Sequence, residues 1–203
     1  MYSKERAVAI AKNDIRFIPV GINENVTLKS AKLDKSPNGN SYLEVVFEKD
    51  GATLSQTEWK PTKFDTMSDE DLQKKVDTQF SRMMQILLCF YTDEQLIFNG
   101  TTFEAFAKEV VDYLNNADKT KLLKVKVVYN NKGYTTLPNY AKYTFIEPMT
   151  LEQDKKSAIV ELSIDNFVKP VIADKEPVVT GVASSLSLNA MGAQTAVSSD
   201  LPF

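Results

Sequence analysis

The 203-residue chain has no histidine and only one cysteine, and each shortage excludes a class of chemistry. Without histidine there is no Ser-His-Asp triad, no Cys-His nucleophile pair and no imidazole metal ligand. A single cysteine cannot form an intramolecular disulfide or a thiolate zinc cluster, and this usage is typical of a reducing compartment. We therefore expect a protein that is not an enzyme and that uses neither a metal nor another cofactor.

Long hydrophobic runs and glycine-rich motifs are also missing. No apolar run approaches the length of about 18 residues that a membrane-spanning helix needs. Residues 7–11 are too short for the core of a signal peptide. The seven glycines are isolated and make no phosphate-binding loop. These absences predict a soluble, cytoplasmic protein.

Charge of one sign is concentrated in separate segments, although the net charge is only −3. Residues 1–35 have a net charge of +3, and residues 64–118 have a net charge of −7. Residues 119–146 contain six lysines and no acidic residue. If the fold brings the two basic segments together, they form a surface that attracts a polyanion. The alternative is that these lysines only solvate exposed strand faces.

The acidic residues of the middle segment give a weak indication of metal chemistry. Asp65, Asp69, Glu70 and Asp71 resemble the ligands of a two-metal nuclease site. However, Ser68 and the acids after it are also typical of a helix N-terminus, where negative charge is favourable. We prefer the helix, and we expect no metal site.

Hydrophobic periodicity predicts three strands, two helices and then further strands. Strands are expected at residues 26–33, 42–48 and 53–59, with a hairpin turn at Asp50-Gly51. Helices are expected after the N-cap Ser68 and from the capping-box pattern Thr101-Thr102-Phe103-Glu104, within an insert of about residues 66–117. Strands then resume at 122–129 and 140–146, with a further candidate at 158–164. In the strand at 122–129, Lys124 and Lys126 are predicted to lie on the polar face.

Two architectures fit this order. The first is a mainly β fold in which a five-stranded OB-type barrel carries the two helices between its third and fourth strands. The second is an open α+β sheet with the helices on one face. The strict alternation favours the barrel. We expect a domain over residues 1–170 and a flexible tail over residues 171–203, because the tail is poor in large apolar side chains.

Aromatic and basic residues interleave in the predicted strands and loops. A groove for single-stranded nucleic acid needs cations for the phosphates and exposed rings on which bases stack. The candidate rings are Tyr42, Trp59, Tyr134 and Tyr140. The candidate phosphate contacts are Lys29, Lys32, Lys60, Lys124, Lys126, Lys132 and Lys142. For each ring the alternative is packing in the core.

The last four residues, Asp200-Leu201-Pro202-Phe203, are typical of a ligand for another protein. The ring can fill a pocket, the terminal carboxylate can meet a basic side chain, and proline limits the entropy lost on binding. This ending resembles the C-terminal tip of bacterial and bacteriophage single-stranded DNA-binding proteins. Residues 21–26, 41–59 and 127–138 are similar to the phage members of that family that have an OB domain.

The resemblance implies an OB fold that coats single-stranded DNA and a tip that recruits replication, recombination and repair proteins. It also implies a location in the host cytoplasm if the protein comes from a phage. Two features depart from the family. The tip has one acid, Asp200, where an acidic run is usual, and the helical insert is larger than in the bacterial tetrameric type.

Three functions therefore stay open. The leading one is a non-catalytic single-stranded DNA-binding protein. The first alternative is a structural or adaptor protein that uses the same barrel for protein contacts, and the second is a metal-dependent nuclease that uses Asp69 or Asp71.

Overall fold

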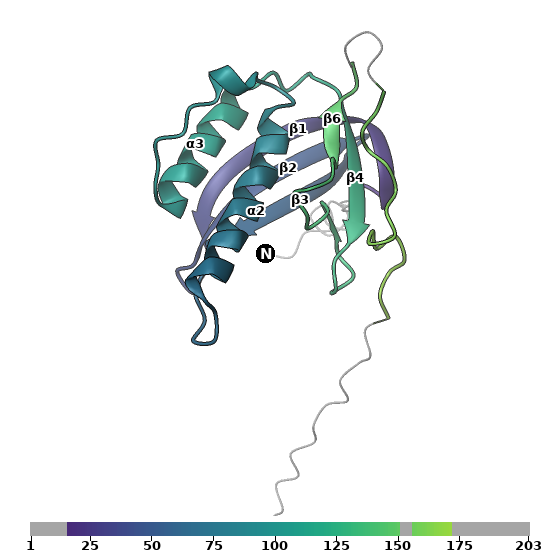
Figure 1. The fold of residues 1–203 in the computed structure, drawn as a ribbon. Coiled ribbons are helices and arrows are strands. Elements are labelled where there is room, and N and C mark those ends of the chain that lie inside the picture. Colours follow the sequence, from purple (N-terminus) through teal and green to yellow (C-terminus); the bar gives the residue numbers. More distant parts are fainter. Residues whose placement is uncertain (1–15, 151–155, 172–203) are drawn as a thin grey trace, which may run out of the picture. The chain divides into compact units, whose positions relative to one another are not determined.

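A six-stranded antiparallel sheet carrying two helices forms the centre of the fold (Figure 1). The computed structural model describes residues 16–150 and 156–171. The strands are β1 (Gly21–Lys35), β2 (Ser41–Lys49), β3 (Ala52–Trp59), β4 (Leu123–Tyr129), β5 (Thr135–Thr136) and β6 (Ile146–Pro148). Helix α2 (Asp69–Leu87), the 3-10 helix η1 (Asp93–Gln95) and helix α3 (Phe103–Asn116) lie between β3 and β4. The predicted mainly β chain with a helical insert is confirmed.

Strand β1 bends because it belongs to two ladders. Its first half pairs with β4 and its second half, from Thr27 onward, pairs with β2. The register shifts between Asn23 and Val26, where Asn25 has a φ of 60°, a left-handed value that asparagine tolerates better than most residues. Such bulges increase the local bend and twist of a strand. The sheet therefore curves around the core.

The β2–β3 hairpin follows its sequence pattern closely. Asp50 and Gly51 have φ values of 50° and 78°, which is the two-residue turn predicted from Asp-Gly. Leu43, Val45 and Phe47 are buried on one face of β2. On β3, Ser55, Thr57 and Trp59 lie on the opposite, outer face. The outer faces of the two strands therefore form one continuous surface.

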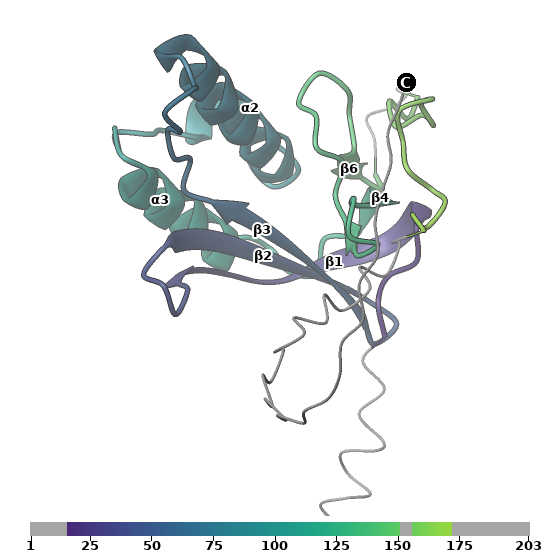
Figure 2. The ribbon, with the colours of Figure 1, turned by 90° about the horizontal axis from the view of Figure 1, so that it is seen from below.

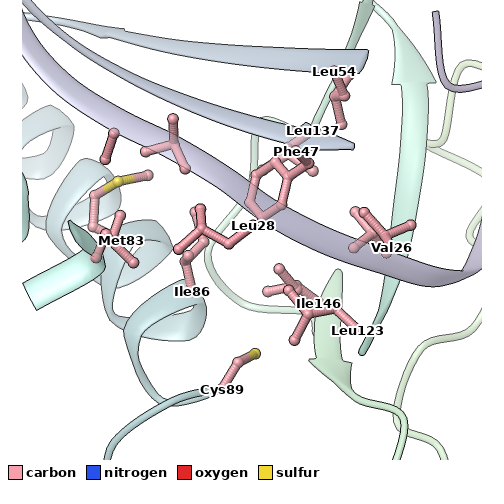
Figure 3. Packing of buried hydrophobic residues seen from close by; sticks show 14 of the residues in the cluster. Val26, Leu28, Phe47, Leu54, Met83, Ile86, Cys89, Leu123, Leu137 and Ile146 are labelled. Atoms are coloured by element: carbon pink, nitrogen blue, oxygen red, sulfur yellow. The ribbon is translucent and has the colours of Figure 1, made fainter. Parts of the chain in front are cut away.

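Helix α2 begins at the predicted cap Ser68, and α3 begins at Thr102, one residue after the start of the predicted capping-box pattern. Both helices lie over the inner face of the sheet (Figure 2). The side chain of Ser68 accepts a hydrogen bond from the N–H of Asp71, and that of Thr102 accepts one from the N–H of Ala105. The core between helices and sheet contains, among others, Leu28, Phe47, Met83, Ile86 and Ile146 (Figure 3).

Cys89 is part of this core (Figure 3). Burial raises the pKa of its thiol to about 12. Because only the thiolate is a good nucleophile, this thiol is unreactive in the folded chain.

The sheet is not closed into a barrel by backbone pairing. The strand order is β3-β2-β1-β4-β5, and β6 pairs with β4 instead of extending the path. Between β3 and β5 the connection is made by a side chain. The amide oxygen of Gln56 accepts hydrogen bonds from Thr136 Oγ1 at 2.9 Å and from the N–H of Leu137 at 3.2 Å.

The strand expected at 140–146 is wrong in its bounds. Of these residues only Ile146 is in a strand, and the strand continues to Pro148. The side chain of Gln85 on α2 makes the hydrogen bonds there instead, donating to the carbonyl of Ala141 and accepting from the N–H of Phe145. The candidate strand at 158–164 is also wrong, because this stretch has no regular secondary structure.

Lys126 is the clearest exception to the strand pattern, because its side chain is fully buried. Its ammonium pairs with Asp165 at 2.7 Å and donates to Tyr140 Oη at 2.8 Å and to the carbonyl of Val160. The predicted exposure of Lys126 is therefore wrong. The segment 156–171 covers this face of β4, and the ion pair anchors the segment there.

We expect K126M to lower the free energy of unfolding by about 3–5 kcal/mol, because Asp165 is then buried without its cation. Urea unfolding followed by circular dichroism measures the loss. The matched control is K124M on the same strand. Lys124 forms a more exposed pair with Glu24 at 3.3 Å, so its loss should cost about 1 kcal/mol or less. Equal costs for the two variants would contradict the assigned role of Lys126.

Candidate nucleic-acid interface

Trp59 is the last residue of β3, and its ring is 51% exposed. The strand register pairs it with Tyr42 on β2, and the two ring centroids lie 5.0 Å apart at a tilt of 47°. The ammonium of Lys32 lies 5.7 Å from the centre of the Tyr42 ring. This end of the outer face therefore presents two adjoining rings and a cation, all three of them candidate residues.

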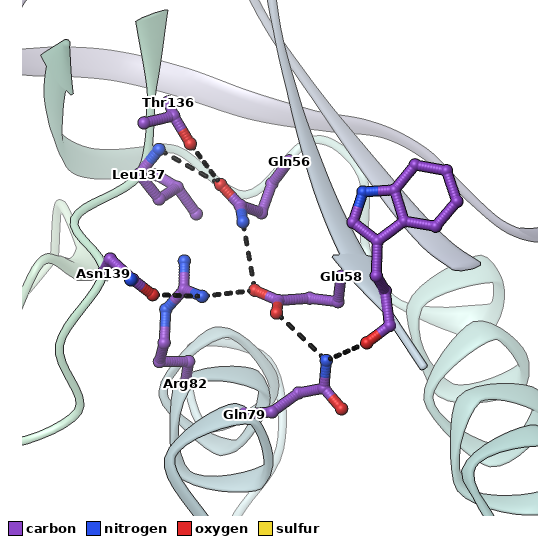
Figure 4. Close-up of polar contacts among 8 residues, drawn as sticks. Gln56, Glu58, Gln79, Arg82, Thr136, Leu137 and Asn139 are labelled. Atoms are coloured by element: carbon purple, nitrogen blue, oxygen red, sulfur yellow. Dashed lines mark hydrogen bonds and ion pairs between the residues drawn. The ribbon is translucent and has the colours of Figure 1, made fainter. Parts of the chain in front are cut away.

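The backbone beneath Trp59 is held by helix α2 (Figure 4). The Gln79 amide donates to the carbonyl oxygen of Trp59 at 3.0 Å and to the Glu58 carboxylate at 3.2 Å. Glu58 in turn pairs with Arg82 at 2.6 Å. A buried polar network thus holds the backbone of Trp59 and, through it, the position of the exposed ring.

Further along the outer face the predicted cations are exposed but paired with acids. Lys29 lies 2.5 Å from Glu48, and Lys32 lies 3.3 Å from both Glu44 and Asp34. These lysines therefore add little net positive charge. An anion can bind these lysines only by displacing the paired carboxylates, which is feasible because exposed ion pairs are weak.

A cleft of about 750 Å³ forms the second part of the candidate site. It is lined by the tip of the β4–β5 hairpin, by Ser55 of β3, by residues 17–20 and by Lys169. Tyr134 is 68% exposed and Phe17 is 63% exposed at this cleft. Lys132 lines it too, and no acid is among the described residues that line it. Among the described residues, neither Lys132 nor Lys169 forms an ion pair.

The hairpin tip is shaped by Asn130 and Gly133. The Asn130 side-chain oxygen accepts hydrogen bonds from the N–H groups of Lys132 at 2.9 Å and Tyr134 at 3.0 Å. Gly133 has a φ of 73°, which a residue with a Cβ rarely adopts. The turn therefore directs Lys132 and Tyr134 into the cleft rather than into the core.

The two parts lie along the same edge strand. Ser55, Thr57 and Trp59 share the outer face of β3, so the distance from the cleft at Ser55 to Trp59 is about 13 Å at the usual rise per residue. The start of the strand is covered, because Arg16 and Ile18 form backbone hydrogen bonds with Thr53. Beyond that point, Ser55 and Trp59 of the outer row are exposed.

The remaining candidate residues differ in how far they are buried and in which acids they contact. Tyr140 is half-buried, and its hydroxyl donates to Asp165 at 2.9 Å; burial first and this carboxylate second raise the pKa of the phenol. The Tyr140 hydroxyl is therefore engaged with the interior, while its stacking role stays a prediction. A phosphate contact for Lys126 is wrong, because its side chain is fully buried. Lys124 is largely covered and paired with Glu24. Lys60 pairs with Glu104 at 2.9 Å, and Lys142 is exposed beside Tyr143.

Two residues of the cleft, Phe17 and Lys169, were not predicted. Phe17 stands beside Arg16, and this pairing of an aromatic with a basic residue is the pattern that indicated the other candidate residues. Its exposure follows from Ile18, which is buried next to it on the opposite side. Nothing in the sequence around Lys169 distinguishes it from other lysines.

The tip at Asp200–Phe203 and the expected tail from residue 172 onward lie outside the described residues.

The acids near the start of α2 are engaged in local contacts. Asp69 accepts from Lys63 at 2.6 Å, and Asp71 accepts from the Ser68 hydroxyl at 2.7 Å. Within residues 16–150 and 156–171, no three histidine, cysteine or acidic side chains are grouped to hold a metal ion. In the same ranges no helix combines the length and apolarity needed to cross a bilayer.

We expect N130A to loosen the hairpin tip. Two hydrogen bonds worth about 1 kcal/mol each are lost, so the amides of Lys132 and Tyr134 should exchange with deuterium about tenfold faster or more. N131A is the matched control, because the Asn131 side chain has no hydrogen bond to any described residue. Equal acceleration in both variants would contradict the role of Asn130.

Comparison of this chain with protein-family models, with curated proteins and with solved structures finds no match.

Proposed function

We propose that this chain binds single-stranded DNA without cleaving it, along the outer face of edge strand β3. The observation that carries the proposal is the position of Trp59 and Tyr134. Two strongly exposed rings lie near opposite ends of the row from Ser55 to Trp59, and beside Tyr134 are cations that pair with no described acid. Exposed rings are costly in water and suit a ligand with planar, stackable groups.

We also infer an OB-type barrel, in which side chains close the seam between β3 and β5. Three features support this inference. The bent strand β1 belongs to both halves of the sheet, the helices lie between the third and fourth strands, and Gln56 bridges the seam. In OB domains the second and third strands and the hairpin loop between the fourth and fifth strands form the usual binding face. Trp59 and Tyr134 occupy the corresponding elements here.

Binding to oligo-dT should weaken steeply with salt and should quench the emission of Trp59, the only tryptophan in the chain. Phosphate contacts release counterions, whereas stacking changes the environment of the indole. A fluorescence titration at two salt concentrations, with single-stranded and duplex DNA, measures both effects. Affinity that ignores salt, with Trp59 emission unchanged, would favour the adaptor function instead.

The contributions of the cleft residues can be separated. Y134A should weaken oligo-dT binding by about 5- to 150-fold, the loss of one stacked base, and leave the salt slope unchanged. K132A should reduce the slope of log affinity against log salt by about 0.7, the value for one phosphate contact. I97A and K108A are the controls, since both residues are exposed and neither lines the cleft. Effects equal to those of the controls would remove the cleft from the interface.

A further inference from the structure

A second cleft, of about 460 Å³, lies between the end of β3 and helix α2. Trp59 and Asn139 line it together with four cationic side chains: Lys60, Lys74, Lys75 and Arg82. Within residues 16–150 and 156–171, no acidic side chain lines this cleft. The cleft therefore gathers cationic side chains beside the ring that is proposed to stack a base, although α2 belongs to the acidic middle of the sequence.

Arg82 supplies a donor group that the protein does not use fully. The residue is only 5% exposed, yet Nη1 alone makes its contacts, with Glu58 and with the side-chain oxygen of Asn139 (Figure 4). Its Nε has no hydrogen-bond partner among the described residues. A buried donor without a partner is costly, and Arg82 lines the cleft, so an oxyanion in the cleft would meet an arginine whose hydrogen-bonding capacity is not saturated.

The three lysines are available to a ligand to different degrees. Lys75 forms no ion pair with any described residue, and its ammonium lies 5.0 Å from the centre of the Phe64 ring. Lys74 pairs with Glu70 at 2.9 Å, and Lys60 pairs with Glu104 at the same distance. Both pairs are exposed and hence weak, so a phosphate can take the place of either carboxylate.

We propose that this cleft binds a phosphodiester group of the DNA strand that stacks on Trp59. Helix α2 then forms a second wall of the interface, and the strand turns from the outer face of β3 toward Lys74 and Lys75. This assignment rests on the function proposed above. A phosphodiester suits the cleft because it carries negative charge and offers only acceptor oxygens, matching the donors of Lys75 and Arg82.

The test compares two double variants that remove the same charge. K74Q/K75Q should weaken binding of oligo-dT by roughly tenfold and lower the salt slope by about 0.7 for each lost contact. K108Q/K119Q, at exposed lysines outside the cleft, should leave the slope unchanged. Equal slopes for the two double variants, with wild-type protein binding normally, would overturn the α2 assignment. Absence of salt-dependent binding by wild-type protein would instead overturn the proposed function.

Lysine acetylation followed by mass spectrometry maps the same contact without a substitution. In the full-length chain saturated with oligo-dT, Lys75 should react several-fold more slowly than in the free protein, while Lys108 reacts at an unchanged rate. Protection of Lys132 without protection of Lys75 would confine the strand to the outer face of β3, which contradicts the proposal.

Discussion

The ion pair between Glu58 and Arg82 lies where β3, helix α2 and the segment after β5 meet. Both side chains are less than a tenth exposed, so each charge depends on the other for its stability. Around the pair, Gln79 holds the backbone of Trp59 and Gln56 holds the segment that follows the hairpin. One buried network thus fixes both ends of the candidate interface, the ring at Trp59 and the loop at Tyr134, relative to the same strand.

Local chemistry made much of the fold predictable. The alternation in β2, the Asp50-Gly51 turn and the caps Ser68 and Thr102 each depend on residues that are close in sequence, so the pattern alone determines the structure. The seam between β3 and β5 could not be predicted in this way. It depends on Gln56 meeting a hairpin about 80 residues later, and a buried glutamine gives the same alternating pattern as an exposed one.

The candidate site also combines features that depend on local sequence with features that depend on distant contacts. Trp59 and Tyr134 are exposed because their neighbours are polar, which is a local property. The burial of Lys126 depends instead on Asp165, which lies far along the chain in a segment without regular structure. The pairing of Lys32 with Glu44 follows from the β1–β2 register, and a register derived from the turn would have revealed it. The pairing of Lys29 with Glu48 could not be derived in this way, because the register shifts between Leu28 and Ser30.

This distribution of charge affects how the proposed interface would work. On the outer face, carboxylates already satisfy the lysines, so a phosphate there gains only the difference between two weak exposed pairs. Cationic side chains gather at the hairpin cleft and at the cleft beside α2, and no acid is among the described residues that line either one. In the proposed interface, the rings between these two clefts carry the binding energy. An interface built in this way holds the backbone at separated points and tolerates different bases between them, because every base has a face that can stack.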